Sequence, residues 1–392
     1  MRSRSQNSTA RKSSDTRIQE GNKQIRNSSF ELLRILSMFC IVSCHFATHG
    51  KFDFDTNTVT LPRLWWYFLE MGGNFGVNVF VLISGYFLIT AKGELLNLKR
   101  ILKFWGQVFF YSVLIYSAFG LLGTSGFSST PITNIIFPIT FRQWWFASTY
   151  FVLYLLHPFI NRFLSGLDKK EYQSFLVLLL GIWCVIPTIS REAFQSNSLL
   201  WFITLYCVAA YIKLYGLTPK LRPKHCIYLW LLTSFLRYLT SVQIVVTRSG
   251  QSFDQEDALS LYATQSIFTF LSALFFFMMF KNLKIGYHKW INVIASATFG
   301  VYLIHDHPVI RSFLWQTVFK NASYQESALI VPYSIGAACL VYSVCTVLDL
   351  LRQATVEKAY KFVVNNKAES ISKPFRLVIE SFKRLAFGEQ SK

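Results

Sequence analysis

The stretch Arg34-Ile-Leu-Ser-Met-Phe-Cys-Ile-Val-Ser-Cys-His45 lies inside an apolar segment, residues 31–49. A segment of this length and composition is typical of a helix that crosses a membrane. Arg34 and His45 are 11 residues apart, close to three full turns, so both project from one face of the helix. Because ionisable groups inside a bilayer are costly, they are usually functional. The stretch therefore predicts an anion-binding arginine near one membrane surface and a base at depth.

A structural interpretation of the same helix stays open. Arg34 could extend its side chain to lipid phosphate, and His45 could hydrogen-bond a neighbouring backbone carbonyl. Neither arrangement would need a substrate, so the choice depends on what else lies at the same depth.

Nine further apolar segments follow the first. The ten comprise residues 31–49, 64–90, 101–123, 143–160, 173–190, 198–215, 226–246, 258–280, 291–310 and 327–350. Apolar residues make up 52% of the 392-residue chain and charged residues only 15%, which is typical of a membrane protein. We therefore expect an all-α, polytopic membrane protein with about ten transmembrane helices.

The distribution of Lys and Arg predicts that both termini are cytoplasmic. With the N-terminus inside and ten alternating spans, 31 of the 39 Lys and Arg residues lie in cytoplasmic segments and 7 in outer ones. This bias is the one that sets the orientation of membrane helices. It also accounts for most of the net charge of +19, so that charge does not indicate nucleic-acid binding. It could attract anionic membrane lipid or a phosphorylated cytoplasmic ligand.

Three regions follow from these patterns. Residues 1–29 are basic and polar, and we expect them to be disordered. Residues 30–350 form the transmembrane domain. Residues 351–392 form a basic, patchily amphipathic tail that we expect on the cytoplasmic membrane surface.

A second cluster, His305-Asp306-His307-Pro308, ends the ninth segment. His305 and His45 each lie 14 residues into their segments, about 21 Å along a helix, so we expect them at the same depth. Asp306 could orient an imidazole from another helix and set its tautomer. The alternative is that His307 and Asp306 are solvated residues at the outer mouth, and Pro308 is expected to unwind the helix there.

We expect no metal ion. His305 and His307 do not have the i, i+4 spacing of a helical metal pair. The seven cysteines, all within or at the edge of apolar segments, show no metal-ligand spacing either.

The second segment contains Gly72-Gly73-Asn74-Phe75-Gly76, which we expect to interrupt the helix beside the site. Asn78, Ser84 and Tyr86 follow this interruption and could bind ligand hydroxyl groups. The alternative is a flexible outer turn with packing glycines.

Basic and aromatic residues mark two further segment starts. The third segment opens on Lys99, Arg100 and Lys103, and the fourth opens on Arg142, Trp144 and Trp145. The basic group could anchor the helix at the cytoplasmic surface or clamp the phosphates of a nucleotide-like cofactor. The tryptophans could be interface anchors or a platform on which a sugar stacks. Arg237, inside the seventh segment, needs an acidic or carbonyl partner.

Five motifs, taken in order, resemble the membrane-bound acyltransferase-3 family over about residues 29–350. They are Phe30-Glu31-Leu-Leu-Arg34 followed by His45, Phe75-Gly-Val-Asn-Val-Phe-Val-Leu-Ile-Ser84-Gly85-Tyr86, Leu98-Lys-Arg-Ile-Leu-Lys103, Trp144-Trp145-Phe with Tyr154-Leu-Leu-His-Pro158, and Thr298-Phe-Gly-Val-Tyr-Leu-Ile-His305. Any one of them is weak, whereas five in order with ten spans are quite specific.

The resemblance implies a bacterial plasma-membrane O-acyltransferase. Such enzymes move an acyl group, commonly acetyl, from cytoplasmic acyl-CoA to a sugar hydroxyl of a surface glycan or its lipid-linked precursor. His45 matches the family's essential histidine and Arg34 its paired arginine. Lacking the esterase-like domain of many relatives, the chain resembles the stand-alone type that modifies exopolysaccharide or capsule. Asn78 and Lys103 depart from residues found in some relatives.

This chemistry agrees with the residues. A neutral His45 could remove the hydroxyl proton as the sugar attacks the thioester, or could itself take the acyl group. Arg34, with Lys99, Arg100 and Lys103, would hold the phosphates of CoA. His305 could orient the acceptor or share proton transfer. Two other functions remain possible, a proton-coupled transporter or lipid-linked oligosaccharide exporter, and a non-catalytic receptor.

Overall fold

The computed structural model describes residues 27–55, 57–91, 97–123, 130–217, 221–248 and 255–360, with three single residues, 373, 377 and 381. Within these ranges the regular secondary structure is helical, with no strand. The predicted all-α fold is therefore confirmed for the described residues. The expectations for residues 1–26, and for the tail beyond residue 360 apart from those three positions, lie outside them.

The long helices coincide closely with the apolar segments. They are α1 (Ser28–Thr48), α2 (Leu61–Leu88), α3 (Leu98–Leu121), α6 (Trp145–Gly166), α7 (Lys169–Leu180), α9 (Ser198–Tyr215), α10 (Pro223–Thr247), α12 (Ile267–Asn282) and α16 (Ile330–Ala354). Shorter helical pieces are α5 (Ile132–Ile136), η1 (Gly181–Val185), α8 (Ile186–Ser190), α11 (Gln255–Leu259), η2 (Ser260–Tyr262), α13 (Lys289–Ser296), α14 (Thr298–His305), α15 (Pro308–Ser312), η3 (Phe313–Val318) and η4 (Asn321–Tyr324). Apolar runs of this length predicted helices well because a chain segment inside a bilayer must satisfy its own backbone hydrogen bonds, which a helix does.

Eight helices of the described chain are long and apolar enough to cross a membrane. A ninth span is formed if Lys289–His305 and Pro308–Tyr324, bent by 76° relative to each other, count together. Helix α6 corresponds to another expected span and has 22 residues, but it is not among these candidates. The chain is thus a multi-pass helical membrane protein, and its described residues contain eight or nine candidate spans by length and composition.

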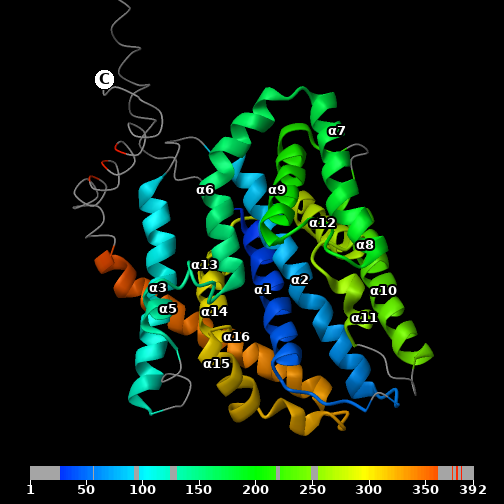
Figure 1. The fold of residues 1–392 in the computed structure, drawn as a ribbon, viewed down its shortest axis with the longest axis vertical. Coiled ribbons are helices and arrows are strands. Elements are labelled where there is room, and N and C mark those ends of the chain that lie inside the picture. Colours follow the sequence, from blue (N-terminus) through cyan, green and yellow to red (C-terminus); the bar gives the residue numbers. More distant parts are fainter. Residues whose placement is uncertain are drawn as a thin grey trace, which may run out of the picture.

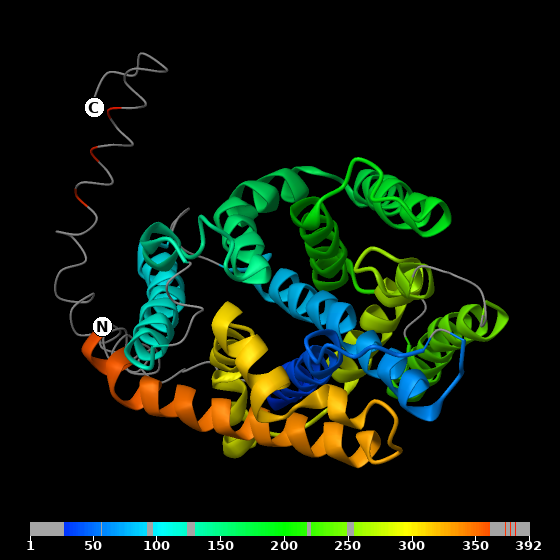
Figure 2. The same cartoon turned by 60° about the horizontal axis from the view of Figure 1, so that its bottom comes forward.

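Helix α1 lies near the middle of the helical assembly (Figure 1). It contacts α2, α12, α13, α14 and α16, and Figure 2 shows α16 running along one side of the assembly. The side chain of Asn27 caps α1 by accepting a hydrogen bond from the backbone N–H of Ser29. Leu33, Val42 and Phe46 of α1 are fully buried. The helix that carries the main motif is therefore packed within the protein.

The second expected helix is continuous, so the predicted interruption is wrong. Helix α2 runs for 28 residues through Gly72, Gly73 and Gly76. A Cβ at Gly72 would lie 2.5 Å from the carbonyl oxygen of Cys40, and one at Gly73 would lie 2.6 Å from Cys44 Sγ. The glycines let the backbones of α1 and α2 approach closely, as small residues do between membrane helices.

The ninth expected helix is broken near its end, as expected at Pro308. Helix α14 ends at His305 and α15 begins at Pro308, whose missing N–H is not needed at the first position of a helix. His307 caps α15, since its Nδ1 accepts a hydrogen bond from the backbone N–H of Val309 at 3.2 Å. The break leaves Asp306 in the bend between the two helices.

A buried polar network joins α3 and α16. The carboxylate of Asp349 is fully buried and accepts hydrogen bonds from Tyr111, Arg352 and Gln353, each at 2.7 Å. Gly300 of α14 lies against it so closely that a Cβ there would overlap the Asp349 carboxyl group. Three helices are therefore fixed to one another around a single acidic side chain.

Arg237 is buried inside α10 and is held by neutral groups. Its Nη1 donates to Thr269 Oγ1 at 2.9 Å and its Nη2 to the Met71 carbonyl at 3.0 Å. The guanidinium also lies 5.3 Å from the centre of the Tyr262 ring. The expected partner of this arginine was an acid or a carbonyl, and the structure shows the backbone carbonyl of Met71. This hydrogen bond links α10 to α2.

Candidate active site

The two helices bring His45 and His305 into direct contact. His45 Nδ1 lies 2.9 Å from His305 Nε2, and the two ring centres are 5.0 Å apart. His305 is fully buried, and its Nδ1 lies 2.6 Å from the Val301 carbonyl one turn earlier in α14. The expectation that both histidines lie at the same depth is borne out by this contact.

These contacts assign the tautomers of a neutral pair. A carbonyl oxygen can only accept a hydrogen bond, so the Nδ1 of His305 must carry the proton that Val301 receives. The Nε2 of a neutral His305 is then an acceptor, and His45 Nδ1 donates to it. The lone pair of His45 consequently lies on Nε2, where it can accept a proton.

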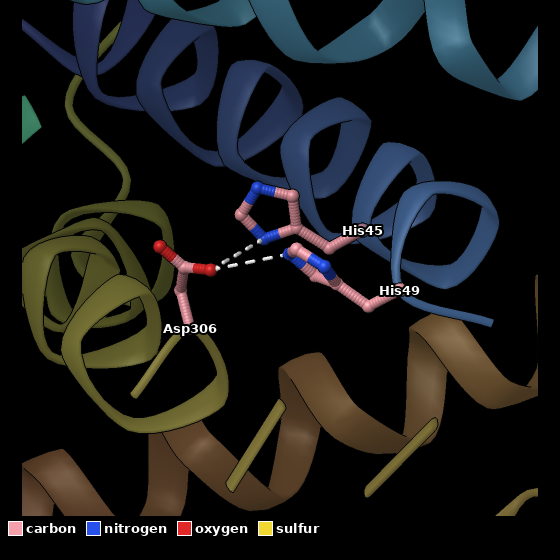
Figure 3. A group of neighbouring side chains, drawn as sticks. All are labelled: His45, His49 and Asp306. Carbon is pink, nitrogen blue, oxygen red and sulfur yellow. Dashed lines mark ion pairs between the residues drawn. The ribbon is translucent and has the colours of Figure 1, made fainter. Parts of the chain in front are cut away.

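Asp306 lies beside this pair and faces three side chains. Its Oδ1 is 3.6 Å from His45 Nδ1 and 3.5 Å from His49 Nε2. Figure 3 shows both imidazoles directed toward this oxygen. Arg311 Nη2 lies 3.4 Å from the same oxygen and donates to the Asp306 backbone carbonyl at 3.0 Å. The buried carboxylate can therefore stabilise positive charge that develops on His45 or His49.

The same cluster also has the spacing of a metal site. Ligand atoms of His45, His49 and Asp306 lie within 4.8 Å of one another, and two imidazoles with a carboxylate suit zinc. Arg311, however, already places a positive charge 3.4 Å from the carboxylate, and His45 Nδ1 is engaged by His305. The arrangement fits proton transfer better than cation binding.

His307 is fully buried and Asp306 is only 3% exposed, so the alternative that they are solvated at an outer mouth is wrong. Its ring lies edge-on to Tyr116 and to Trp144, with centre-to-centre distances of 4.6 and 5.2 Å. Together with its capping of α15, these contacts make His307 a structural residue.

A cavity of about 680 Å³ lies beside His45, bordered by α1, α2, α3, α6 and α14. Helix α1 lines it with Arg34, Met38, Ile41, Cys44, His45, Thr48 and His49, and α2 lines it with Glu70, Gly73, Asn74, Val77, Phe80 and Ser84. Because these positions recur every three or four residues, one face of each helix borders the cavity along its length.

The cavity has two chemically different ends. Thr48 of α1 forms a hydrogen bond with Glu70 of α2, whereas Ser37, earlier in α1, packs against Gly76, later in α2. The two helices are therefore antiparallel. Arg34 therefore lies at one end, here called the Arg34 end, about 16 Å along α1 from His45. The other end, which includes Thr48, His49 and Glu70, is called the His49 end. The wall between them is apolar and comprises Met38, Ile41, Val77 and Phe80.

Arg34 borders the cavity and forms an ion pair with the buried side chain of Glu31. Its Nη1 lies 2.6 Å from Glu31 Oε1, one turn earlier on α1. The Arg34 side chain is 30% exposed, and its guanidinium has five N–H donors, so it can still bind an anion in the cavity. Glu31 fixes its orientation for this purpose.

The three basic residues of α3 lie outside the cavity wall. Lys99, Arg100 and Lys103 are exposed, and none of them lines the cavity. Lys103 Nζ forms an ion pair with Glu357 at 2.7 Å. The adjacent Phe104 does line the cavity. The structure thus brings Arg34, but not this basic group, to the cavity.

The three candidate residues of α2 have different surroundings. Asn78 is fully buried, donating to the Thr264 carbonyl at 2.7 Å and accepting from Trp201 Nε1 at 3.0 Å, so it links elements and does not line the cavity. Ser84 lines the cavity at the Arg34 end, away from the His49 end. Tyr86 stacks on Phe30, outside the cavity wall.

The start of α6 contributes aromatic side chains to the cavity wall. Trp145 lines the cavity, whereas Trp144 is fully buried against His307. Arg142 is exposed and does not line the cavity. Of Arg142, Trp144 and Trp145, which were predicted to bind substrate, only Trp145 lines the cavity.

His49 and Glu70 are among the cavity residues that were not predicted from the sequence. His49 lies one turn after His45, and the i, i+4 spacing on α1 was an available signal. Glu70 is an acidic residue inside an apolar segment, and its position there was also a signal. Both lie at the His49 end.

The chain matches a known protein family over most of its length. Residues 27–350 match a family model described as an acyltransferase domain, acyltransferase-3. No curated protein and no solved structure matches the chain. The match extends over both the Arg34 and the His305 motifs.

Proposed function

The chain belongs to the acyltransferase-3 family, and on this premise we propose that it is a membrane O-acyltransferase acting on sugars. The donor is cytoplasmic acyl-CoA, acetyl-CoA in the first instance. The acceptor is a sugar hydroxyl of a bacterial surface polysaccharide, such as exopolysaccharide or capsule, or of its lipid-linked precursor. The protein acts in the plasma membrane.

One observation carries this proposal. The guanidinium of Arg34 lies at one end of a single cavity, and the wall in the middle is apolar. Beyond that wall lies His45, whose Nε2 is free to accept a proton. A CoA thioester has matching parts: anionic phosphates, a long flexible chain and a reactive carbonyl. With its phosphates at Arg34, its chain would pass Met38 and Val77 toward His45.

The reaction uses His45 as a general base and then as a general acid. Its Nε2 removes the proton from the sugar hydroxyl while the oxygen attacks the thioester carbonyl. When the tetrahedral intermediate collapses, the C–S bond breaks and the thiolate of CoA takes that proton. Asp306 offsets the transient positive charge on the imidazole, and His305 holds its orientation. Transfer through an acyl group carried on His45 is a second route within the same geometry.

The charge distribution sets the orientation that we propose. Lys99, Arg100 and Lys103 lie at the start of α3, in a segment that the positive-inside rule assigns to the cytoplasm. The Arg34 end then faces cytoplasmic acyl-CoA and the His49 end faces the acceptor. The exposed basic group could steer the anionic donor toward the cavity without lining it.

The proposal is tested with purified protein in nanodiscs, radiolabelled acetyl-CoA and a surface-polysaccharide extract from the producing cells. Free CoA and labelled polysaccharide should appear in equal amounts. Unlabelled succinyl-CoA as a competitor then probes the choice of acyl group. If several acyl donors give no free CoA even with acceptor present, the acyltransferase proposal is wrong and a transporter becomes the better hypothesis.

Replacing Arg34 by Gln should raise the KM for acetyl-CoA about 10- to 100-fold with a smaller change in kcat. The reason is loss of a charge-assisted hydrogen bond to phosphate, worth about 1.5–3 kcal/mol. S-acetyl-N-acetylcysteamine, a thioester without phosphates, should be used equally well by wild type and variant. The exposed Arg222→Gln variant is the matched control. Equal losses with both donors would remove phosphate binding from the role of Arg34.

A further inference from the structure

We propose that Glu70 is the acceptor-binding residue and that it makes the enzyme select neutral, hydroxyl-rich sugars over acidic ones. This inference rests on the proposed acyltransferase function. It concerns the His49 end of the cavity, for which neither the sequence motifs nor the family match assigns a ligand.

Glu70 is positioned beside the catalytic histidine by two side chains of α1. Thr48 Oγ1 donates to Glu70 Oε1 at 2.9 Å, and Cys44 Sγ lies 3.5 Å from Oε2. Cys44 and Thr48 lie on either side of His45 along the helix, and all four residues line the cavity. The carboxylate is therefore held within about one helical turn of the proposed base.

The Glu70 carboxylate retains hydrogen-bonding capacity for a ligand. A carboxylate has about four acceptor sites, and Thr48 and Cys44 use two of them. In the described part of the chain no Lys, Arg or His lies within ion-pair distance of it. Two neighbouring hydroxyls of a sugar ring could therefore donate hydrogen bonds to the remaining acceptor sites of Glu70.

The other acid at this end cannot take that role. Asp306 is only 3% exposed, and its Oδ1 already faces His45, His49 and Arg311. Glu70 is only partly buried. Of these two carboxylates, Glu70 is thus the one that a substrate can reach.

The charge of Glu70 has a consequence for specificity. At a pH at which Glu70 is ionised, a sugar that carries its own carboxylate would place two negative charges close together in a site of low dielectric constant, which is unfavourable. A neutral sugar would instead donate hydroxyl protons to Glu70 and be positioned with one hydroxyl at His45. Neutral acceptors should therefore be favoured by at least tenfold in kcat/KM.

The test compares matched acceptors. Neutral oligosaccharides are prepared from the polysaccharide that serves as acceptor, and a portion is oxidised at C6 to the corresponding acids. Wild type should favour the neutral set at least tenfold. Glu70→Gln, which keeps the shape but removes the charge, should raise the KM for neutral acceptor about tenfold and reduce the preference to less than threefold. Thr48→Val should shift both quantities in the same direction by a smaller factor.

Controls separate this inference from folding and from the proposed function. Glu326→Gln changes an exposed glutamate away from the cavity and should behave as wild type. A purely structural Glu70 would lower activity on both acceptor sets equally, and that result would overturn the inference. So would a wild-type preference for the acidic set, or an unchanged preference in Glu70→Gln. Transfer by wild type with any of these results would leave the acyltransferase function intact, whereas no CoA release by wild type would reject both.

Discussion

Replacing His45 by Ala is expected to lower acyl transfer about 10²- to 10⁴-fold, the range typical of a lost general base. His45 is the imidazole that both lines the cavity and receives a fixed orientation, from His305 at 2.9 Å. Without it, a sugar hydroxyl must attack the thioester while still carrying its proton. The measurement is transfer of radiolabelled acetyl groups to acceptor, together with release of CoA.

His225→Ala is the matched control, because His225 is an exposed histidine at the start of α10. This variant should keep wild-type activity. Each variant is checked by size-exclusion chromatography and thermal unfolding before its activity is compared. Transfer by folded His45→Ala at the wild-type rate would remove His45 from the mechanism.

Replacing Gly300 by Ala is expected to lower the free energy of unfolding by about 3 kcal/mol or more. The added Cβ would overlap the carboxyl group of Asp349. Asp349 cannot simply move aside, because Tyr111, Arg352 and Gln353 all donate hydrogen bonds to it. Overpacking alone typically costs about 1–3 kcal/mol, and separating a buried ion pair adds to it.

Thermal unfolding in detergent measures this effect. Gly336→Ala is the matched control, because a Cβ at Gly336 of α16 would meet no atom within 4 Å. That variant should be unchanged or slightly more stable, since alanine favours a helix over glycine. Equal unfolding temperatures for the two variants would show that α14 can move away from α16 without cost.

Particular residues show where the sequence was informative. The apolar segments predicted helices such as α9 at their observed bounds, because a membrane helix must be apolar over a set length. The glycines at 72, 73 and 76 were misread as an interruption. Glycine serves both helix breaks and close helix packing, and only the presence of α1 against α2 decides between them.

The candidate binding residues show the same limit. Asn78 and Lys103 have polar side chains suited to ligands, yet one is buried between α2, α9 and the Thr264 carbonyl and the other pairs with Glu357. Their partners lie far away in the sequence. Residue type alone therefore could not show that these groups were already engaged.

The sequence by itself determined that the chain is an all-α membrane protein, that Arg34 and His45 share one helix face, and that His305 lies at a matching depth. These properties follow from local periodicity and from the fixed thickness of a bilayer. Only the tertiary structure decided that His305 fixes the tautomer of His45, that Asp306 serves both His45 and His49, and that Glu70 borders the same cavity. Such relations depend on how helices distant in the chain pack together, and that packing sets which lone pairs and charges remain free for a substrate.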